Sequence, residues 1–353
     1  MRSSKSFSSY AMKRSICAGI AGVSVVCSTV FATAQEPTSS SAPNTQVIRV
    51  WGYNGLSAQM LSWESEYSTL HPDVHFENQF HGASAVMAGL YNGVADIALM
   101  GREIWPVETM AYLWVYQQQP FGVIVATAGF HAPGQLFTPV VIVNAKNPLV
   151  SISLSQLDAI YGSEHRAAPA NIRTWGDLGL EGAWAKKPIH PYGFGGEDAL
   201  GVFFRHDVLR SDFKPNPDSH LLSDHDHGPV SAAHRIALAV AADPYAIGYT
   251  SLPPGTATKA LAVSSPTAVQ PAEDTIADHK YAFTRSVWLY FRRVPDKSVD
   301  SKVDGFVRFL LTPKAQALVH PSDELLPLTP ELRQKQLEKL DKPMPKSATL
   351  GEE

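Results

Sequence analysis

The sequence predicts an α/β protein whose strands form mainly parallel sheets covered by helices. Two observations predict this class: short apolar strands alternate with helices along the chain, and 44% of the residues are hydrophobic while 18% are charged, the balance of a globular protein. A third observation, the pattern of the N-terminus, predicts that the protein works outside the cytoplasm.

The N-terminal residues 1–35 have the order of a secretory signal peptide. Basic residues precede an apolar run, residues 16–31, that has the length of a signal core rather than of a full membrane span. The small residues Ala32 and Ala34 follow where a signal peptidase cleaves. We expect cleavage near Ala34 and a periplasmic or secreted mature protein; a retained anchor and lipid attachment at Cys27 are the alternatives.

Cysteine usage and charge exclude several classes of function. Both cysteines, Cys17 and Cys27, lie in the signal segment, so the mature chain is expected to have no disulfide, thiolate metal site or cysteine nucleophile. A formal net charge of -4 offers no basic surface, and no nucleic-acid partner is expected. Walker and GxSxG motifs are absent from the sequence, so we expect no cofactor and no enzyme; a hydrolase with dispersed catalytic residues is the alternative.

The first half of the mature chain alternates strands and helices. A polar Pro/Ser linker at residues 36–46 precedes the first apolar run. Helices are indicated by apolar residues three and four positions apart, and strands by period-two alternation or short apolar runs. The predicted elements are a strand at 47–51, a helix at 60–70, a strand at 74–80, a helix from Ser84 to Gly93 and a strand at 95–100.

The second half repeats this alternation. A capping box at Ser155–Asp158 predicts the start of a short helix, and Pro330 is expected at the first position of the last helix. The other predicted elements are strands at 139–144, 189–192 and 246–249 and helices at 198–209, 231–242 and 303–310.

A series of short segments has a characteristic order. They are Gly52-Tyr53-Asn54, Trp63, His71-Pro72-Asp73-Val74, Gly82-Ala83-Ser84, residues 93–98, Arg102-Glu103, 139–148, 154–161, 172–178, Ile247-Gly248-Tyr249, 281–290 and 325–328. In this order and spacing they resemble the phosphate-binding proteins that feed ABC importers. The resemblance covers roughly residues 47–330.

The resemblance implies a two-lobed periplasmic binding protein of type II, with a ligand cleft between lobes that close by hinge motion. It predicts a first lobe at 47–130, a second at 131–255, a return to the first at 256–330, and a C-terminal helix and tail at 331–353. The crossings between lobes are expected near 123–130 and 249–254. The implied ligand is phosphate or another small anion, the implied partner is an ABC permease, and we expect a monomer. A non-transport sensory or interaction protein with a different ligand is the alternative.

The ligand site is expected at the corners where strands lead into helices. Helix N-termini there present N–H groups and the positive end of a dipole, which suits an oxyanion. The candidate ligand-binding residues at these corners are Asn54, Gly55, Ser57, Ser84, Arg102, Gly195 and Asp198. Asn54 stands where relatives have a hydroxyl residue, and Ser84 matches their serine; a role of Ser84 as a helix N-cap is the alternative, and the two roles are compatible.

Two corners depart from the resemblance. After the third strand, relatives carry serine or aspartate, whereas this chain has Arg102, which either clamps an oxyanion or pairs with Glu103. At the fourth corner relatives have an arginine followed by Ser-Gly-Thr, and the matching positions are Phe194, Asp198, Ala199 and Leu200. We interpret Asp198 as the N-cap of its helix and expect Phe194 and Leu200 to form a drier cleft wall. Phosphate should therefore bind more weakly than in an ordinary relative.

The SDHDHG segment holds the densest set of metal-ligand side chains in the sequence. His225 and His227 lie on one side of an extended chain, and His220 or His234 offers a further ligand for a divalent cation. Adjacent residues do not all face one ion, so we expect a solvated loop and no metal.

Overall fold

The computed structural model describes residues 46–129, 138–167, 170–211, 214–226, 228–295, 297–319 and 325–343. The predicted signal peptide, its cleavage site near Ala34 and almost all of the linker lie outside these residues, so these assignments stay predictions. None of the helices in the described ranges is long and apolar enough to cross a membrane.

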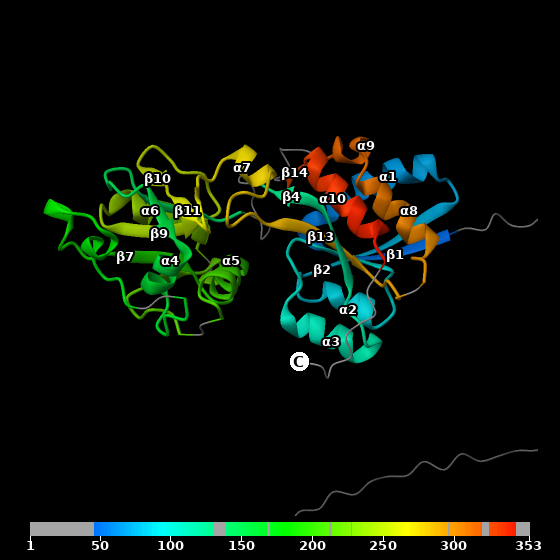
Figure 1. The fold of residues 1–353 in the computed structure, drawn as a ribbon, viewed down its shortest axis with the longest axis horizontal. Helices are drawn as coiled ribbons and strands as arrows, with labels where there is room; N and C mark the ends of the chain where they lie inside the picture. The colour runs from blue at the N-terminus through cyan, green and yellow to red at the C-terminus, as the bar shows by residue number, and fades with distance from the viewer. Residues whose placement is uncertain are drawn as a thin grey trace, which may run out of the picture. The chain divides into compact units, whose positions relative to one another are not determined.

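The first lobe is built around a six-stranded sheet with the strand order β14-β4-β13-β3-β1-β2 (Figure 1). Most of its elements come from the N-terminal part of the chain, and the rest return from the C-terminal part. The strands are β1 (Gln46–Tyr53), β2 (Val74–His81), β3 (Ile97–Met100), β4 (Phe121–Ala128), β13 (Ser286–Phe291) and β14 (Leu325–Leu326). The helices are α1 (Ser57–Leu70), α2 (Val86–Tyr91), α3 (Pro106–Tyr116), α8 (Ser301–Leu310), α9 (Pro313–Gln316) and α10 (Pro330–Asp341).

Helices cover both faces of this sheet. Helices α1, α8, α9 and α10 lie on one face, and α2 and α3 lie on the other (Figure 1). Trp63 of α1 is fully buried, and its indole Nε1 donates to the Ala315 carbonyl oxygen of α9 at 3.0 Å. The apolar stripe predicted around Trp63 therefore packs α1 against a helix about 250 residues later in the chain, which joins the two ends of the sequence in one core.

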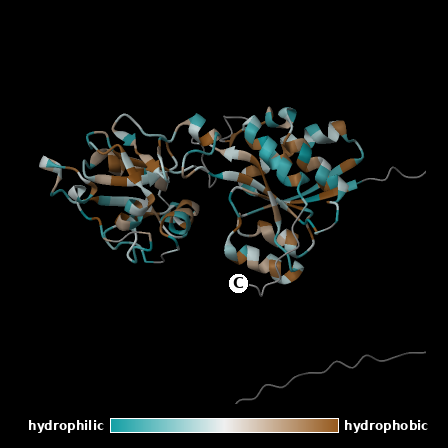
Figure 2. Ribbon diagram, viewed as in Figure 1, coloured by the Kyte–Doolittle hydropathy of each residue, from teal (hydrophilic) through white to brown (hydrophobic). Residues whose placement is uncertain are grey.

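The second lobe holds a five-stranded sheet, β10-β5-β9-β7-β8, and a three-stranded sheet, β12-β11-β6. The strands are β5 (Val140–Asn144), β6 (Ser151–Ser153), β7 (His190–Phe194), β8 (His220–Leu222), β9 (Ala246–Thr250), β10 (Thr258–Ala260), β11 (Ala262–Ser264) and β12 (Ala268–Val269). The helices are α4 (Leu154–Tyr161), α5 (Ala199–Phe203), α6 (Ala232–Ala242) and α7 (Glu273–Ala277). Figure 2 shows hydrophobic residues on both the strands and the helices of each lobe.

Glycine allows helix α5 to lie close to the loop that follows β7. A Cβ added at Gly201 in α5 would lie 1.8 Å from the carbonyl oxygen of Gly195. Any side chain at Gly201 would therefore push α5 away from the loop that follows β7. This contact fixes the position of the β7-to-α5 corner, one of the four corners predicted to hold ligand.

Two predictions about the architecture are wrong. The sheets are mixed rather than mainly parallel, because β13 runs antiparallel to both β3 and β4, and β5 runs antiparallel to β9. The second lobe also extends beyond residue 255, since β10 pairs with β5 and β11 pairs with β6. The chain returns to the first lobe only after Phe283, which lies in the second core, and so the crossing expected at 249–254 comes later.

Helix starts follow the expected chemistry with small shifts. The last helix begins with Pro330, and the Thr329 hydroxyl accepts from Leu332 N at 3.3 Å, as the sequence predicts. The capping box of α4 is formed by Ser153 and Gln156, two residues before the predicted position, because Ser153 Oγ accepts from Gln156 N at 3.1 Å.

Candidate functional site

Two neighbouring cavities lie at the strand-to-helix corners, and both are lined by Arg102, Trp105, Ala199 and Arg285. The first, here called the serine cavity, has a volume of about 310 Å³; its other lining residues are Tyr53, Gly82, Ala83, Ser84, Gly101, Glu197 and Val202. The second, the tryptophan cavity, has a volume of about 240 Å³; its other lining residues are Glu103, Ile104, Phe203, His206, Asp207, Ala282, Thr284, Ser286 and Trp288.

Arg102 is the predicted site residue that the structure places most centrally. It follows β3, is 8% exposed, and its guanidinium group forms a bidentate ion pair with Glu108 of α3 at 2.8 Å for both contacts. The guanidinium carbon lies 3.7 Å from the ring centroid of Trp105. The alternative in which Arg102 pairs with the Glu103 side chain is wrong, because Arg102 Nη1 donates to the Glu103 backbone oxygen at 3.0 Å and the carboxylate partner is Glu108.

The Glu108 pair leaves one edge of Arg102 available. Arginine carries five N–H donors, and the three hydrogen bonds to Glu108 and to the Glu103 carbonyl use both donors of Nη1 and one of Nη2. Among the described residues the Nε and the second Nη2 donors have no partner. These two donors form the side edge of the guanidinium group, whose geometry matches two oxygens of a carboxylate or phosphate.

Arg285 is a second cation of the site, and the sequence interpretation missed it. It directly precedes β13, is 7% exposed, and its guanidinium carbon lies 5.1 Å from the ring centroid of Phe203 in α5. Burial lowers the pKa of Arg285 to about 10, and the positive charge of Arg102 contributes in the same direction while Asp207 opposes it. The family segment 281–290 contained the residue, but no motif distinguished it from an ordinary strand-end arginine.

Ser84 lines the serine cavity without capping a helix. Helix α2 begins at Val86 and its N-cap is Ala85, so the alternative of Ser84 as a helix cap is wrong. Ser84 is exposed and lies between Ala83 and Ala85 in the turn after β2. Its hydroxyl is therefore not used by the helix and is exposed at the cavity that Arg102 lines.

Four of the other predicted residues do not line either cavity. Asn54 and Gly55 lie in an exposed 3-10 turn after β1, and Ser57 begins α1. Their neighbour Tyr53 lines the serine cavity instead. Gly195 is buried, and its N–H donates to the Leu222 carbonyl oxygen of β8 at 2.9 Å, so this amide is held by the sheet.

Asp198 is at the N-cap position of α5, as predicted, but its carboxylate does not cap the helix. One oxygen accepts from Asp224 N at 3.3 Å, and the other is buried and has no partner among the described residues. Burial, together with the neighbouring Asp224 and Glu197 charges, raises the pKa of Asp198. The residues on either side, Glu197 and Ala199, line the serine cavity, whereas Asp198 faces the loop at 223–224.

Phe194 and Leu200 belong to the core of the second lobe and not to the wall of these cavities. Both are 5% exposed, and Phe194 packs on Tyr249 with a ring-centroid distance of 5.8 Å. The prediction of a drier cleft wall from these two residues is therefore wrong. The apolar part of the lining comes from Trp105, Phe203 and Trp288.

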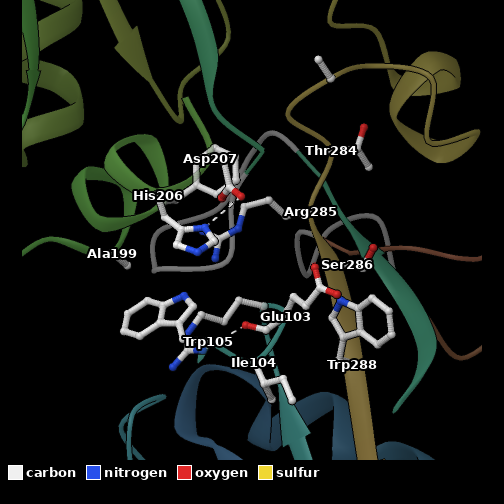
Figure 3. A pocket seen from close by; sticks show the side chains of 13 residues that line it. Glu103, Ile104, Trp105, Ala199, His206, Asp207, Thr284, Arg285, Ser286 and Trp288 are labelled. Atoms are coloured by element: carbon white, nitrogen blue, oxygen red, sulfur yellow. Dashed lines mark hydrogen bonds and ion pairs between the residues drawn. The ribbon is translucent and has the colours of Figure 1, made fainter. Parts of the chain in front are cut away.

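The tryptophan cavity combines aromatic and ionisable side chains. Figure 3 shows the rings of Trp105 and Trp288 at opposite sides of the cavity, with Arg285 and the His206–Asp207 pair above them. His206 Nδ1 lies 3.1 Å from Asp207 Oδ1. The two tryptophans come from segments far apart in the sequence, the start of α3 and strand β13, so no local motif indicates that they face one cavity.

The SDHDHG segment makes a short 3-10 turn at Asp224–Asp226, and its carboxylates accept hydrogen bonds within the fold. Asp224 Oδ1 accepts from Ala232 N at 2.6 Å, and Asp226 Oδ2 accepts from Arg235 at 3.0 Å. The described residues contain no cluster of three or more His, Cys, Asp or Glu arranged to hold a metal ion. His227 lies outside the described residues.

Comparisons with known proteins agree on one family. A sequence model described as a PBP superfamily domain matches residues 37–314. The phosphate-binding protein PstS of Pseudomonas aeruginosa is 28% identical over 295 residues, which cover 82% of this chain and 85% of that protein. PstS from Borrelia burgdorferi has a similar structure, with a TM-score of 0.57 and 17% identity over 80% of this chain and 99% of that one. An ABC-type phosphate transport receptor from Vibrio cholerae is similar with a TM-score of 0.53 and 19% identity over 79% of this chain and 99% of that one.

Proposed function

Since this chain belongs to the PBP superfamily, we propose that it is an extracytoplasmic solute-binding protein of phosphate-binding type that captures a small oxyanion for an ABC importer. The names of its relatives, a phosphate-binding protein and an ABC-type phosphate transport receptor, support this ligand class and this partner. The N-terminal signal pattern supports delivery to the periplasm or the exterior. We expect the mature protein to act as a monomer.

The observation that carries the proposal is the available edge of Arg102. Glu108 and Trp105 hold the guanidinium group in place, so an oxyanion meets a donor pair that is already oriented. Arg285 adds a second positive charge to the same lining, and the exposed hydroxyl of Ser84 adds a neutral donor. Together they suit an anion with two or three acceptor oxygens.

We propose binding without chemistry. His206 pairs with Asp207, and within the described residues its ring has no hydrogen bond to a serine or threonine hydroxyl, the arrangement that nucleophilic hydrolysis needs. The lining groups instead hold and orient charge, which is sufficient for a receptor.

A ligand panel on the mature protein tests this function. Phosphate, sulfate and a carboxylate should be titrated by calorimetry and by thermal shift, because a ligand of the folded state raises the melting temperature. Arg102→Lys keeps a positive charge beside Glu108 but removes the two-donor edge, so binding of the preferred anion should weaken by about tenfold or more. Arg308→Lys, which alters a half-exposed pair with Asp304, is the matched control. If no anion in the panel binds, the proposed function is wrong.

A further inference from the structure

The two cavities share their cationic residues but differ in what surrounds them. Arg102 and Arg285 line both. On the serine cavity side most of the other groups are small, such as Gly82, Ser84 and Gly101, and Tyr53 and Val202 add apolar surface. On the tryptophan cavity side the rings of Phe203 and Trp288 join that of Trp105, so the cations lie beside an aromatic compartment that also holds charged side chains.

The aromatic rings of the tryptophan cavity are held by neighbours. Trp288 stacks on Tyr290 with a ring-centroid distance of 5.7 Å and an interplanar angle of 14°. Trp105 stacks under Arg102, and Phe203 packs edge-on to Phe283 at 5.9 Å and 89°. A flat substituent would contact preformed apolar surfaces here, so its binding would cost little side-chain conformational entropy.

The joint volume exceeds what inorganic phosphate occupies. Phosphate takes on the order of 100 Å³, estimated from about 30 Å³ for each water-sized group. The serine and tryptophan cavities measure about 310 and 240 Å³. An anion of the size of phosphate placed between the arginines would leave the aromatic compartment to water, and sites of a few hundred Å³ with apolar walls are typical of organic ligands.

We infer that the ligand is an organic phosphonate or phosphate monoester, with its anionic head between Arg102 and Arg285 and its substituent in the tryptophan cavity. This inference rests on the proposed function, because it assigns the substrate class of the same site. The head takes the place that inorganic phosphate would take, and the substituent packs between Trp105 and Trp288. A compact, largely apolar substituent fits best, since Glu103 and Asp207 place carboxylates in the same cavity and would repel a second anionic group.

The electrostatics of the cavity agree with a doubly charged head. Burial lowers the pKa of Arg285, and the positive charge of Arg102, which lines the same two cavities, adds to this lowering. A dianion between the two arginines would relieve their repulsion. A phosphonate or monoester dianion carries no P–OH hydrogen. It therefore needs no carboxylate acceptor at the corner after β3, where this chain has Arg102.

Calorimetric titration of the mature protein with phosphate, methylphosphonate and phenylphosphonate tests the inference. The two phosphonates share a head group and differ only in the substituent. We expect phenylphosphonate to bind at least about tenfold more tightly than methylphosphonate and phosphate. Trp288→Ala should reduce the preference for phenylphosphonate over methylphosphonate to within about threefold.

Two controls make the result decisive. Trp114→Ala removes a tryptophan of α3 that is 72% exposed and lines neither cavity, and it should keep the full preference. Trp288→Phe retains an aromatic ring in β13 and should keep most of the preference. It thereby separates loss of the ring from any disturbance of the strand by Trp288→Ala. Phosphate binding as tightly as both phosphonates, or a preference that survives Trp288→Ala, would overturn the inference while leaving the proposed function standing. Failure of every anion to bind would overturn the proposed function itself.

Discussion

Replacing Glu108 by alanine should destabilise the protein more than removing any exposed ion pair. Glu108 is 8% exposed and accepts three hydrogen bonds: two from the Arg102 guanidinium group and one from Trp105 N, all at 2.8 Å. Without the carboxylate, Arg102 retains a buried positive charge beside the Trp105 ring with no anionic partner. The substitution therefore removes a charge pair, the N-terminal cap of α3 and the support of the proposed ligand edge at once.

The magnitude follows from the burial of both partners. Breaking a buried ion pair by removing one member costs about 3–5 kcal/mol, because the remaining charge stays desolvated. For a domain of roughly 150–250 residues, each kcal/mol lowers the melting temperature by about 2–4 °C, so a decrease on the order of 10 °C is expected. A half-exposed pair such as Arg308–Asp304, whose side chains are 38% and 31% exposed, should be worth less than about 1 kcal/mol.

Urea denaturation followed by circular dichroism measures both variants under the same conditions. Glu108→Ala is expected to lower the free energy of unfolding by at least about 3 kcal/mol, and Asp304→Ala by less than about 1 kcal/mol. Glu108→Gln should fall between them, because an amide oxygen still accepts but carries no charge. If Glu108→Ala costs no more than Asp304→Ala, the Arg102–Glu108 pair is not a buried anchor and the reasoning about a preoriented ligand edge fails.

Burial raises the pKa of Glu64 to about 7 from an ordinary value of 4.5. Between these pH values the folded state keeps a proton that the unfolded chain has lost, so the free energy of unfolding should fall by about 3 kcal/mol as the pH rises from 4.5 to 7. Glu64→Gln should abolish this dependence in urea titrations at pH 5 and 8, whereas exposed Glu77→Gln should retain it. Inorganic phosphate should bind more weakly than to an ordinary family member, because Asp198 and Leu200 stand where the resemblance implies two hydroxyl residues at the fourth corner. Submicromolar binding by calorimetry would contradict this. Intact-mass measurement of the secreted protein should give a chain beginning close to Gln35, not one retaining the apolar run. Chelator treatment should leave the melting temperature unchanged, and a stoichiometric metal lost on His225→Ala would refute that expectation.

The existence of the elements was predictable because apolar periodicity and caps are local properties. The strand at 95–100 and the helix opened by Pro330 depend only on residues within a few positions of each other. Boundaries were less certain where two serines lie close together: Ser153 and Ser155 both suit a cap, and the hydrogen bond between Ser153 and Gln156 decides between them. Strand direction depends on partners far away in the sequence, which is why the antiparallel β13 was not foreseen.

The site was predictable only in part, because a side chain's role depends on what competes for it. Arg102 and Ser84 follow strands whose ends meet at one edge of a sheet, so position alone brought them together. The partner of Arg102 was misjudged because Glu103 is adjacent in sequence, whereas helical geometry brings Glu108 to the guanidinium group. Asp198 was placed at the right backbone position, but its carboxylate turns to the loop at 224, which lies 26 residues later.

By itself, the sequence determined the alternation of strands and helices, the family and two of the residues that line the cavities, and it predicts an export signal. These follow from composition, from local hydrophobic periodicity and from the order of short segments, none of which requires knowing what lies opposite in space. Only the tertiary structure decided that Arg285 and Trp288 line the same cavities as Arg102, and that Phe194 and Leu200 do not. The physical reason is that burial and charge pairing depend on distances across the fold, and residues about 180 positions apart in the chain become neighbours only when strand β13 returns to the first sheet.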